Sequence, residues 1–285
     1  MIFKLKNKKV SIVVLNYNGK DLLKKCLESI KNKTQYENYE IIVVDNNSTD
    51  DSIKMLQKFF TEVKLIQNPK NYGFPKGNNI GTKKALRNGA DFILLLNNDT
   101  EVTKKWLKEM VRVANSDEKI GIVGSKLILP TGKTQKSCCN YKYGLSRKFA
   151  PQKREVVDSL VAACMLIKKG VIEKIGFLDE NFFPIYYEDV DFCLRAEKVG
   201  YKTVYVPQSK VYHHKGITMK KQDWQFEAYH TNRLRFFSKH FPISWLIMRF
   251  LIEPRNILKS IKEGKLKTLL SIYSRHIRSN KSSIQ

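Results

Sequence analysis

The triplet Asn97-Asn98-Asp99 directly follows an apolar run at residues 92–96. A run this short, bounded by polar residues, is typical of a buried parallel strand. Ligands of open α/β sheets bind just beyond the carboxyl ends of such strands. The carboxylate of Asp99 is a hard oxygen ligand that could hold a divalent cation, which in turn could hold a phosphate group. In the alternative interpretation, residues 97–100 only cap a helix predicted at residues 102–113.

Three acidic residues, Glu188, Asp189 and Asp191, follow a stretch rich in aromatic residues. Apolar residues at helical spacing predict a helix at residues 189–199, so Glu188 and Asp189 belong to its first turn. The helix dipole alone favours carboxylates at that end. Three acids in four residues exceed what capping requires, however, and a carboxylate among aromatic side chains is a candidate general base.

A carboxylate and a histidine pair end two other predicted strands. Asp45 follows an apolar run at residues 41–44 and could accept hydrogen bonds from a nucleobase or a ribose. In the same cluster, Ser48 or Thr49 is predicted to cap a helix at residues 51–60, and the alternative is that the cluster serves only as a cap. At the other strand end, an imidazole of the pair at residues 213–214 could complete a metal site.

Three glycines fall within the nine residues from Gly73 to Gly81. Glycine tolerates unusual dihedral angles and leaves room for a ligand beside the backbone. The helix predicted next, at residues 79–87, would turn its N-terminus toward a phosphate. The spacing matches neither of the common phosphate-binding motifs, so the pattern alone leaves the ligand open.

The elements that must position these residues alternate between strands and helices. In the first part of the chain, amphipathic helices separate strands predicted at residues 10–16, 41–44, 63–66 and 92–96. This alternation is typical of a parallel, doubly wound sheet, whose strand ends align at one edge. Further short strands are predicted at residues 121–124, 126–129, 202–206 and 210–212. Residues 130–151 lack a clear period and are predicted to form a surface loop or hairpin that faces the substrate.

Composition limits the classes of protein to be considered. The chain has 285 residues, of which 42% are hydrophobic, enough for one large core with an appendage. We expect no signal peptide. We also expect no membrane-spanning helix, because the apolar stretch at residues 241–252 is too short. The protein is therefore expected to be cytoplasmic. Five cysteines without paired spacing argue against a disulfide framework or a zinc site. The net charge of +25 calls for a polyanionic partner: nucleic acid, an acidic membrane or a phosphorylated substrate.

Six motifs in order resemble those of the inverting family 2 glycosyltransferases of the GT-A fold, especially the rhamnosyltransferase-like branch. They fall within residues 10–218 and are VSIVVLNYNG, VVDNNSTD, NYGFPKGNNIG, LLLNNDT, YYEDVDFCLR and VYHH. The resemblance implies an α/β fold in which a Rossmann-like nucleotide-binding half with a mixed, mostly parallel sheet joins an acceptor-binding half. It also implies an enzyme that moves a sugar from a nucleoside diphosphate sugar to a hydroxyl acceptor, for which we expect a lipid-linked saccharide or a cell-surface glycan precursor.

The resemblance implies a set of nucleotide-binding residues. Asp45 is the implied nucleobase contact, and Asn97 would meet the ribose or diphosphate. The complete implied set is Asn16, Asp45, Asn71, Gly73, Asn97 and Asn98. Asn97 stands where many relatives have aspartate, which leaves fewer anionic ligands for a metal. Pro75 and Ala162 also depart from the residues usual in the family, and neither is used to predict the donor.

The resemblance also implies a metal site and a catalytic base. Asp99 takes the position of the family's metal ligand, and His213, rather than His214, is the implied further ligand of Mg²⁺ or Mn²⁺. Asp189 of the Glu188-Asp189 pair is the implied catalytic base. It would remove the acceptor's proton during a single inverting displacement, without a covalent enzyme intermediate.

The chain changes character after residue 218, so we predict a glycosyltransferase domain at residues 1–218 and a helical extension at residues 219–285. Residues 216–285 contain fourteen Lys and Arg against four Asp and Glu, a net charge of +10, interleaved with aromatic residues. Basic amphipathic helices with aromatic edges suit the surface of an anionic membrane. We therefore expect peripheral association with the inner face of the cell membrane. The alternative is that these helices only pack on the catalytic domain.

Two other functions fit parts of the pattern. The charge and the interleaved aromatic residues would also suit a nucleic-acid-binding protein. The basic residues are scattered through the chain, however, and no recognised nucleic-acid module is present, so we expect no nucleic-acid partner. The second alternative is an inactive nucleotide-sugar-binding domain, against which the joint presence of Asp99, Asp189 and His213 argues. The sequence identifies neither the sugar nor the acceptor nor the linkage.

Overall fold

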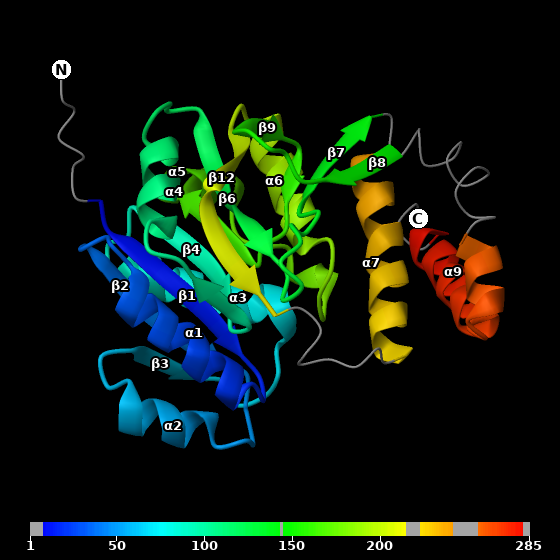
Figure 1. Cartoon of the computed structure of the whole chain (residues 1–285). Coiled ribbons are helices and arrows are strands. Elements are labelled where there is room, and N and C mark those ends of the chain that lie inside the picture. The colour runs from blue at the N-terminus through cyan, green and yellow to red at the C-terminus, as the bar shows by residue number, and fades with distance from the viewer. Residues whose placement is uncertain (1–7, 143–144, 215–222, 242–255, 282–285) are drawn as a thin grey trace.

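A mixed sheet with helices on both faces forms most of the structure (Figure 1). The computed structural model describes residues 8–142, 145–214, 223–241 and 256–281. Its strands are β1 Val10–Asn16, β2 Tyr39–Asp45, β3 Lys64–Gln67, β4 Phe92–Asn97, β5 Thr100–Val102, β6 Ile120–Ile128, β7 Cys138–Lys142, β8 Leu145–Phe149, β9 Glu155–Val157, β10 Ser159–Leu160, β11 Cys164–Lys168 and β12 Lys202–His213. Its helices are α1 Lys20–Lys33, α2 Ser52–Phe59, α3 Gly73–Arg87, α4 Trp106–Ala114, α5 Lys169–Ile175, α6 Glu188–Lys198, α7 Asp223–His240 and α9 Leu266–Lys281, with a 3-10 turn at Glu180–Phe182. Residues 256–262 are also helical.

The strands of the main sheet follow the order β3-β2-β1-β4-β11-β6-β12-β5, and β9 also pairs with β12. β1 to β4 run parallel to one another, and β6 runs parallel to β12. β11 is antiparallel to both β4 and β6, while β5 and β9 are antiparallel to β12. The prediction of a mixed, mostly parallel sheet is therefore confirmed.

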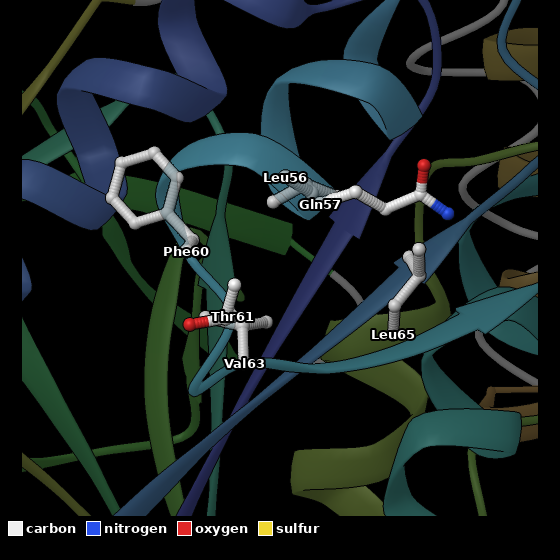
Figure 2. A pocket seen from close by; sticks show the side chains of 6 residues that line it. All are labelled: Leu56, Gln57, Phe60, Thr61, Val63 and Leu65. Atoms are coloured by element: carbon white, nitrogen blue, oxygen red, sulfur yellow. The ribbon is translucent and has the colours of Figure 1, made fainter.

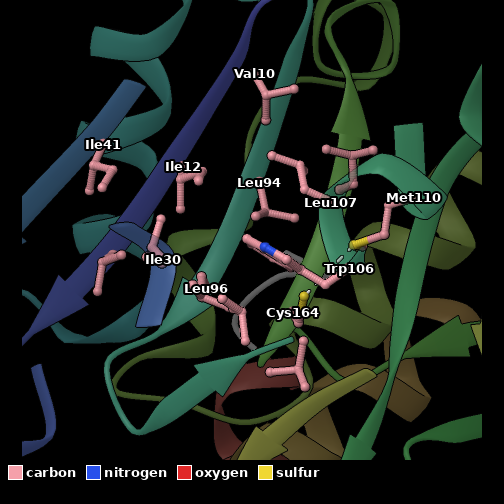
Figure 3. Packing of buried hydrophobic residues seen from close by; sticks show 14 of the residues in the cluster. Val10, Ile12, Ile30, Ile41, Leu94, Leu96, Trp106, Leu107, Met110 and Cys164 are labelled. Atoms are coloured by element: carbon pink, nitrogen blue, oxygen red, sulfur yellow. Dashed lines mark hydrogen bonds between the residues drawn. The ribbon is translucent and has the colours of Figure 1, made fainter. Parts of the chain in front are cut away.

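The central strands are buried on both faces, as their continuous apolar runs predict. Because side chains alternate along a strand, Ile12 and Leu94 point to the face covered by α1 and α4, where they join the cluster around Trp106 (Figure 3). Val13 and Leu95 point to the opposite face, which α3, α5 and α6 cover. The sheet is thus the middle layer of three.

The parallel register aligns the carboxyl ends of the central strands. Asn16, the last residue of β1, pairs with Asp45 at the end of β2. On the other side of β1, Leu15 pairs with Asn97 at the end of β4. The polar residues that follow these strands therefore meet at one edge of the sheet, as the alternation of elements predicted.

The glycine-rich segment differs from its prediction. Helix α3 begins at Gly73 rather than at residue 79, so most of the predicted loop is helical. A Cβ atom at Gly77 would lie 2.4 Å from the side chain of Leu15, and one at Gly81 would lie 2.4 Å from that of Val13. These two glycines let α3 pack closely on β1. The space beside them is filled by the protein itself, so the prediction that it holds a ligand is wrong there.

Two pairs of predicted strands are each one continuous strand, β6 and β12. The hydroxyl groups of Ser125 and Ser209 lie 2.7 Å apart and satisfy each other inside the sheet. A register shift between Val206 and Lys210 accommodates Pro207, since proline cannot donate to a regular ladder. Ser125 and Pro207, where the sequence predicted a break between two strands, therefore lie within continuous strands.

The helix predicted at residues 102–113 begins only at Trp106, because Thr100–Val102 forms β5 against β12. Residues 97–100 therefore do not cap that helix, and the capping interpretation of the triplet is wrong.

The excursion at residues 130–151 contains the hairpin of β7 and β8, which joins β10 in a second, small sheet. All five cysteines are free and buried.

Helix α7 packs on the sheet domain through aromatic side chains. Phe236 and Phe237 are buried in a cluster with Phe182 and Leu194, and α9 packs against α7. For α7, the structure therefore agrees with the alternative in which the helices of the extension pack on the catalytic domain. The apolar stretch at residues 241–252 lies almost entirely outside the described residues, and the division at residue 218 stays a prediction. Among the helices that the structure describes, none combines the length and apolarity needed to cross a membrane.

A surface hollow lies between α2 and the amino end of β3, and Figure 2 shows the side chains that line it. They are Leu56, Gln57, Phe60, Thr61, Val63 and Leu65. None of these lining residues is a predicted site residue. The predicted site residues lie instead beyond the carboxyl ends of the strands. We therefore place the candidate site at the carboxyl edge rather than at this hollow.

Candidate active site

A chain of amide hydrogen bonds holds the polar triplet against β1. The side-chain amide of Asn98 donates to Oδ1 of Asn16 at 2.8 Å, and the amide of Asn16 donates to Oδ1 of Asp45 at 3.0 Å. Asn16 is fully buried, so its side chain is committed to these contacts. Three of the predicted nucleotide-binding residues are thereby joined across the ends of β1, β2 and β4.

The buried carboxylate of Asp45 shapes the loop that follows β2. It accepts hydrogen bonds from the backbone N–H of Ser48 at 2.8 Å and from the Ser48 hydroxyl at 2.6 Å. Ser48 is therefore not the cap of α2. Thr49 is not the cap either, because α2 follows Asp51, which makes no side-chain capping bond. The predicted caps at Ser48 and Thr49 are therefore wrong, although Oδ1 of Asp50 in the same cluster accepts from the backbone N–H of Ser52 at 3.2 Å. The nucleobase contact of Asp45 stays a prediction.

Side-chain amides also order the start of α3. Oδ1 of Asn71 accepts from the backbone N–H of Gly73 at 2.9 Å and from the amide of Asn46 at 3.1 Å. Oδ1 of Asn46 in turn accepts from the amide of Asn68 at 2.8 Å. The sequence reasoning gave no role to Asn46 and Asn68, although each lies two residues beyond the end of a predicted strand, which was the available signal. The structure thus brings the predicted site residues Asn71 and Gly73 into contact with each other near the edge of the sheet.

Gly73 connects this side of the edge to the loop that carries the acidic pair. Its φ of +74° favours glycine, and a Cβ atom there would lie 2.8 Å from the carbonyl oxygen of Pro184. The next backbone N–H, that of Phe74, donates to the same oxygen at 2.7 Å. Close approach of two protein segments, rather than of a ligand, thus explains the glycine at this position.

Asp99 and His213 face each other at the end of β12. Oδ1 of Asp99 lies 3.3 Å from Nε2 of His213, and this buried oxygen has no hydrogen-bond partner among the described residues. His214 instead turns its Nε2 to Oε1 of Glu101 at 2.9 Å. The structure therefore pairs Asp99 with His213 and directs His214 elsewhere, while the role of Asp99 and His213 as metal ligands stays a prediction.

This pair fits Mn²⁺ in its donor types, and its carboxylate also suits Mg²⁺. A carboxylate oxygen and an imidazole nitrogen both suit Mn²⁺, and an unpartnered buried carboxylate oxygen is costly unless a cation or proton satisfies it. Nowhere in the described ranges do three His, Cys, Asp or Glu side chains gather as a metal-binding group. Most of the coordination sphere would therefore come from substrate phosphates and water, which is usual for Mg²⁺.

Gln135 contacts the other nitrogen of His213. Oε1 of Gln135 lies 2.8 Å from Nδ1 of His213, and both side chains are buried. Sequence reasoning missed Gln135, because the unpatterned excursion after β6 offers no signal that it returns to the end of β12.

Glu188 and Asp189 begin helix α6 after two tyrosines in the left-handed region, Tyr186 at φ +87° and Tyr187 at φ +73°. Such backbone strain in bulky residues persists only where the surrounding structure imposes it, and it clusters at functional sites. Burial raises the pKa of Asp189, although backbone N–H groups oppose this. Burial, and secondly the charge of Asp189, raises the pKa of Glu188 well above its ordinary value. Both carboxyl groups of the pair therefore hold a proton more readily than an exposed carboxyl group does.

A short backbone bridge ties Asp189 to the polar triplet. Oδ2 of Asp189 accepts from the backbone N–H of Ala162 at 3.1 Å, and the backbone N–H of Asn97 donates to the carbonyl of Ala163 at 3.0 Å. The two alanines thus connect the acidic pair with the residues that precede Asp99. Both alanines are buried, and their small side chains let the two groups share one framework.

Asp191 has a structural role instead. Its carboxylate lies 2.8 Å from Nε of Arg195, 2.7 Å from Nζ of Lys239 and 2.8 Å from Nε2 of His240. Burial would raise the pKa of Asp191, but the hydrogen bonds of His240 and Lys239 and the charge of Arg195 together lower it to about 2. This ionised carboxylate links α6 to α7.

Helix α7 also fixes the loop in front of the acidic pair. The amide of Asn232, a fully buried residue, donates to the carbonyls of Phe182 at 2.9 Å and Ile185 at 3.0 Å. One α7 side chain thus holds the loop that leads into Glu188. Sequence reasoning placed α7 in the extension and missed this contact, because it joins residues 47 and 50 positions apart.

The family model described as glycosyl transferase family 2 matches residues 11–176, more than half of the chain. The chain belongs to glycosyl transferase family 2. Curated relatives of this glycosyltransferase include the dTDP-rhamnosyl transferase of Shigella flexneri, 27% identical over 73% of this chain and 69% of the relative. Another is the N-acetylglucosaminyl-diphospho-decaprenol L-rhamnosyltransferase of Mycobacterium tuberculosis, 23% identical over 90% and 96%. These relatives place the chain in the rhamnosyltransferase-like branch.

Other relatives of this glycosyltransferase are much longer. The O-antigen biosynthesis protein of Myxococcus xanthus is 30% identical over 74% of this chain, which spans only 18% of that protein. The chain likewise spans 25% of an uncharacterized protein of Sinorhizobium fredii, to which it is 28% identical. The activities of these longer proteins are therefore not transferred to this chain.

Solved structures confirm the GT-A fold. The crystal structure of GalNAc-T7 with UDP, GalNAc and Mn²⁺ matches with a TM-score of 0.66 and 17% identity, over 81% of this chain and 48% of that one. The structure of S. aureus TarS 1–349 in complex with UDP-GlcNAc matches with a TM-score of 0.59 and 17% identity, over 81% and 66%. At this identity, the likeness shows the fold alone.

Proposed function

We propose that this family 2 glycosyltransferase moves a sugar from a nucleoside diphosphate sugar to a hydroxyl acceptor, with inversion at the anomeric carbon. The observation that supports this most is the backbone bridge through Ala162 and Ala163, which places Asp189 and the triplet of Asp99 in one framework. A donor held at the triplet and an acceptor activated by Asp189 would then meet at the same edge of the sheet.

The proposed donor site follows the ends of β1, β2 and β4 and the start of α3. Its residues are Asn16, Asp45, Asn71, Gly73, Asn97 and Asn98. Asn16 and Asp45 would act by holding the edge in place, since both are fully buried. Asn97 and Asn98 are partly exposed and would contact the ribose or diphosphate. This arrangement follows the rule that ligands bind beyond the carboxyl ends of parallel strands.

Asp99 and His213 would hold Mg²⁺ or Mn²⁺. When bound, such an ion would offset the charge that develops on the departing diphosphate. Asp99 contributes the formal negative charge of the triplet, and His213 contributes a neutral nitrogen. The Mn²⁺ in the crystal structure of GalNAc-T7 supports a divalent ion without deciding which metal this chain uses.

Asp189 would act as the general base. It removes the proton of the acceptor hydroxyl while that oxygen attacks the anomeric carbon and the bond to the diphosphate breaks. A base of raised pKa accepts a proton more readily at neutral pH, and general-base assistance is typically worth about 10²–10⁴-fold in rate. Burial raises the pKa of Glu188 and favours its neutral form, which would keep a second negative charge away from the attacking oxygen.

The proposed acceptor is a lipid-linked saccharide or another precursor of a cell-surface glycan. The relative from M. tuberculosis is named for a diphospho-decaprenol substrate, which supports a lipid-linked acceptor. Such an acceptor would be met at the inner face of the cell membrane, where this protein would bind peripherally from the cytoplasm. We propose no nucleic-acid partner.

We place the candidate membrane contact in residues 256–281 rather than at the buried aromatic residues of α7. Phe236 and Phe237 are buried against the sheet domain and are not available to a bilayer. In contrast, Leu258 is 60% exposed and Ile261 is 53% exposed. Residues 256–281 contain seven Lys and Arg against one acidic residue. Each basic residue near an anionic surface contributes about 1 kcal/mol of binding free energy.

A stability screen tests the proposed enzymatic function. The protein is heated with each of a panel of nucleoside diphosphate sugars, with and without Mn²⁺. At about 100 times its Kd, a donor adds about 2.7 kcal/mol to the free energy of unfolding, which raises Tm by about 5 °C in a chain of this size. We expect such a rise for one class of nucleotide, and only with metal. A flat response to every nucleotide sugar, or stabilisation by RNA instead, would contradict the proposal.

Vesicle cosedimentation tests the membrane contact separately. We expect sedimentation with phosphatidylglycerol vesicles, release by high salt, and no sedimentation with phosphatidylcholine vesicles, because electrostatic binding is screened by salt. Replacement of Lys259, Lys262 and Lys267 by Glu should reduce binding, whereas replacement of Lys24 and Lys54 on α1 and α2 should not. Equal binding by both variants, or none by the original protein, would leave the extension as packing only.

A further inference from the structure

The excursion after β6 returns to the proposed metal site through Gln135. Beyond β6, the chain turns back at Gly132, and the backbone N–H of Gln135 donates to the carbonyl of Leu127 at 2.9 Å. Leu127 pairs with Val211 on β12, two residues before His213. Gln135 is therefore held on a backbone ladder that also fixes the strand of the metal-ligand candidate.

We propose that Gln135 is a positioning residue that sets the tautomer of His213 and so aims its lone pair at the cation held by Asp99. This inference rests on the proposed function of the Asp99–His213 pair. Oε1 of Gln135 is 2.8 Å from Nδ1 of His213. An amide oxygen can only accept, so this contact requires the proton on Nδ1. The lone pair of the neutral ring then lies on Nε2, the nitrogen 3.3 Å from Oδ1 of Asp99.

The opposite arrangement would close the site. If the amide of Gln135 were turned, its NH₂ group would donate to Nδ1 of His213, and the proton would move to Nε2. Nε2 would then donate to Asp99 and present no lone pair to a cation. The orientation of one buried amide therefore decides whether the Asp99–His213 pair is a metal site or a closed hydrogen-bonded pair. This gives the excursion a role in the active site beyond facing the substrate.

Three substitutions separate positioning from folding. Gln135→Leu keeps much of the volume and removes the acceptor, while Gln135→Glu keeps an acceptor at the same reach. Gln57→Leu on the exposed face of α2 is the matched control. Loss of a hydrogen-bond partner behind a metal-ligating histidine typically lowers metal affinity by about 10–100-fold. We expect that loss in Gln135→Leu, affinity close to the original in Gln135→Glu, and no change in Gln57→Leu, all measured by calorimetry with Mn²⁺ and a nucleoside diphosphate.

The tautomer of His213 is measured directly in the absence of metal, first in the original protein and then in Gln135→Leu. The chain has five histidines, and ¹⁵N-labelled imidazoles assigned by single substitutions report which ring nitrogen carries the proton. We expect the Nδ1–H form at His213 in the original protein and a loss of that preference in Gln135→Leu. The Nε2–H form in the original protein, or Mn²⁺ affinity in Gln135→Leu equal to the original, would overturn the inference. If the original protein shows the Nδ1–H form and binds no Mn²⁺, the proposed metal site fails while the positioning by Gln135 stands.

Discussion

Replacement of Asp191 by Asn should destabilise the protein strongly near neutral pH. The carboxylate is fully buried and contacts Arg195, Lys239 and His240. An amide of the same shape leaves these donors without their negative partner, and removal of one member of a buried ion pair typically costs about 3–5 kcal/mol. In a chain of this size, that loss corresponds to a decrease in Tm of about 6–10 °C.

The pH dependence of the folding free energy provides a second measure of the Asp191 interaction. The pKa of Asp191 is lowered from 3.8 to about 2 in the folded protein, a difference worth about 2 kcal/mol of folding free energy. Because the folded pKa lies below the unfolded one, this stabilisation is present above the unfolded pKa and is lost as the pH falls through the folded pKa. The stability gap between the original protein and Asp191→Asn should therefore narrow by about 2 kcal/mol between about pH 5 and about pH 2.

Urea unfolding followed by tryptophan fluorescence measures both quantities over the pH range. Asp51→Asn is the matched control, because Asp51 is exposed and pairs only with Lys54 on the surface; we expect no measurable change from it. A gap that stays constant down to about pH 2 would show that the ionised carboxylate of Asp191 is not what stabilises the junction of α6 and α7. Stability of Asp191→Asn equal to that of the control would refute the whole assignment.

Three further substitutions follow from the structure. Asp99→Asn should abolish the metal-dependent rise in Tm with the donor while leaving the unliganded Tm within about 2 °C, as a thermal shift assay would show. Gly73→Ala should lower both Tm and nucleotide affinity more than Gly176→Ala does, since both have φ near +75° but a Cβ atom meets backbone only at Gly73. Asn232→Leu should speed hydrogen exchange in the loop at residues 182–187 before it affects the sheet, and equal exchange in both proteins would contradict that role.

Local pattern predicted the sheet and the edge where the candidate residues gather. The apolar runs before Asn16, Asp45 and Asn97 have the length of strands buried on both faces, and the helices between them leave few alternatives to a parallel sheet. Alignment of their ends then follows from the geometry of parallel strands rather than from any contact between distant residues. For that reason, this part of the site could be predicted from the sequence.

The parts that were missed depend on contacts between distant segments. Gln135 and His213 lie 78 positions apart, and nothing in the composition of the excursion indicates where it returns. The glycines at Gly77 and Gly81 fit a ligand loop as well as a closely packed helix, and only the positions of Leu15 and Val13 decide between them. Such choices are made by tertiary packing, which overrides the local preference of a short segment.

The central claim, that Asp189 is the base and not part of the donor site, is tested by measuring turnover and donor affinity together in Asp189→Asn. The amide keeps the shape of the side chain and loses its basicity. With the nucleotide sugar found in the stability screen, turnover should fall by about 10²–10⁴-fold, while calorimetric Kd for the nucleoside diphosphate stays within about 2-fold, which is less than 1 kcal/mol. Asp117→Asn is the control, because Asp117 is a partly exposed carboxylate that pairs with Lys202 on the surface, and it should change neither. Turnover close to the original in Asp189→Asn, or a loss of donor affinity as large as the loss of turnover, would contradict the account.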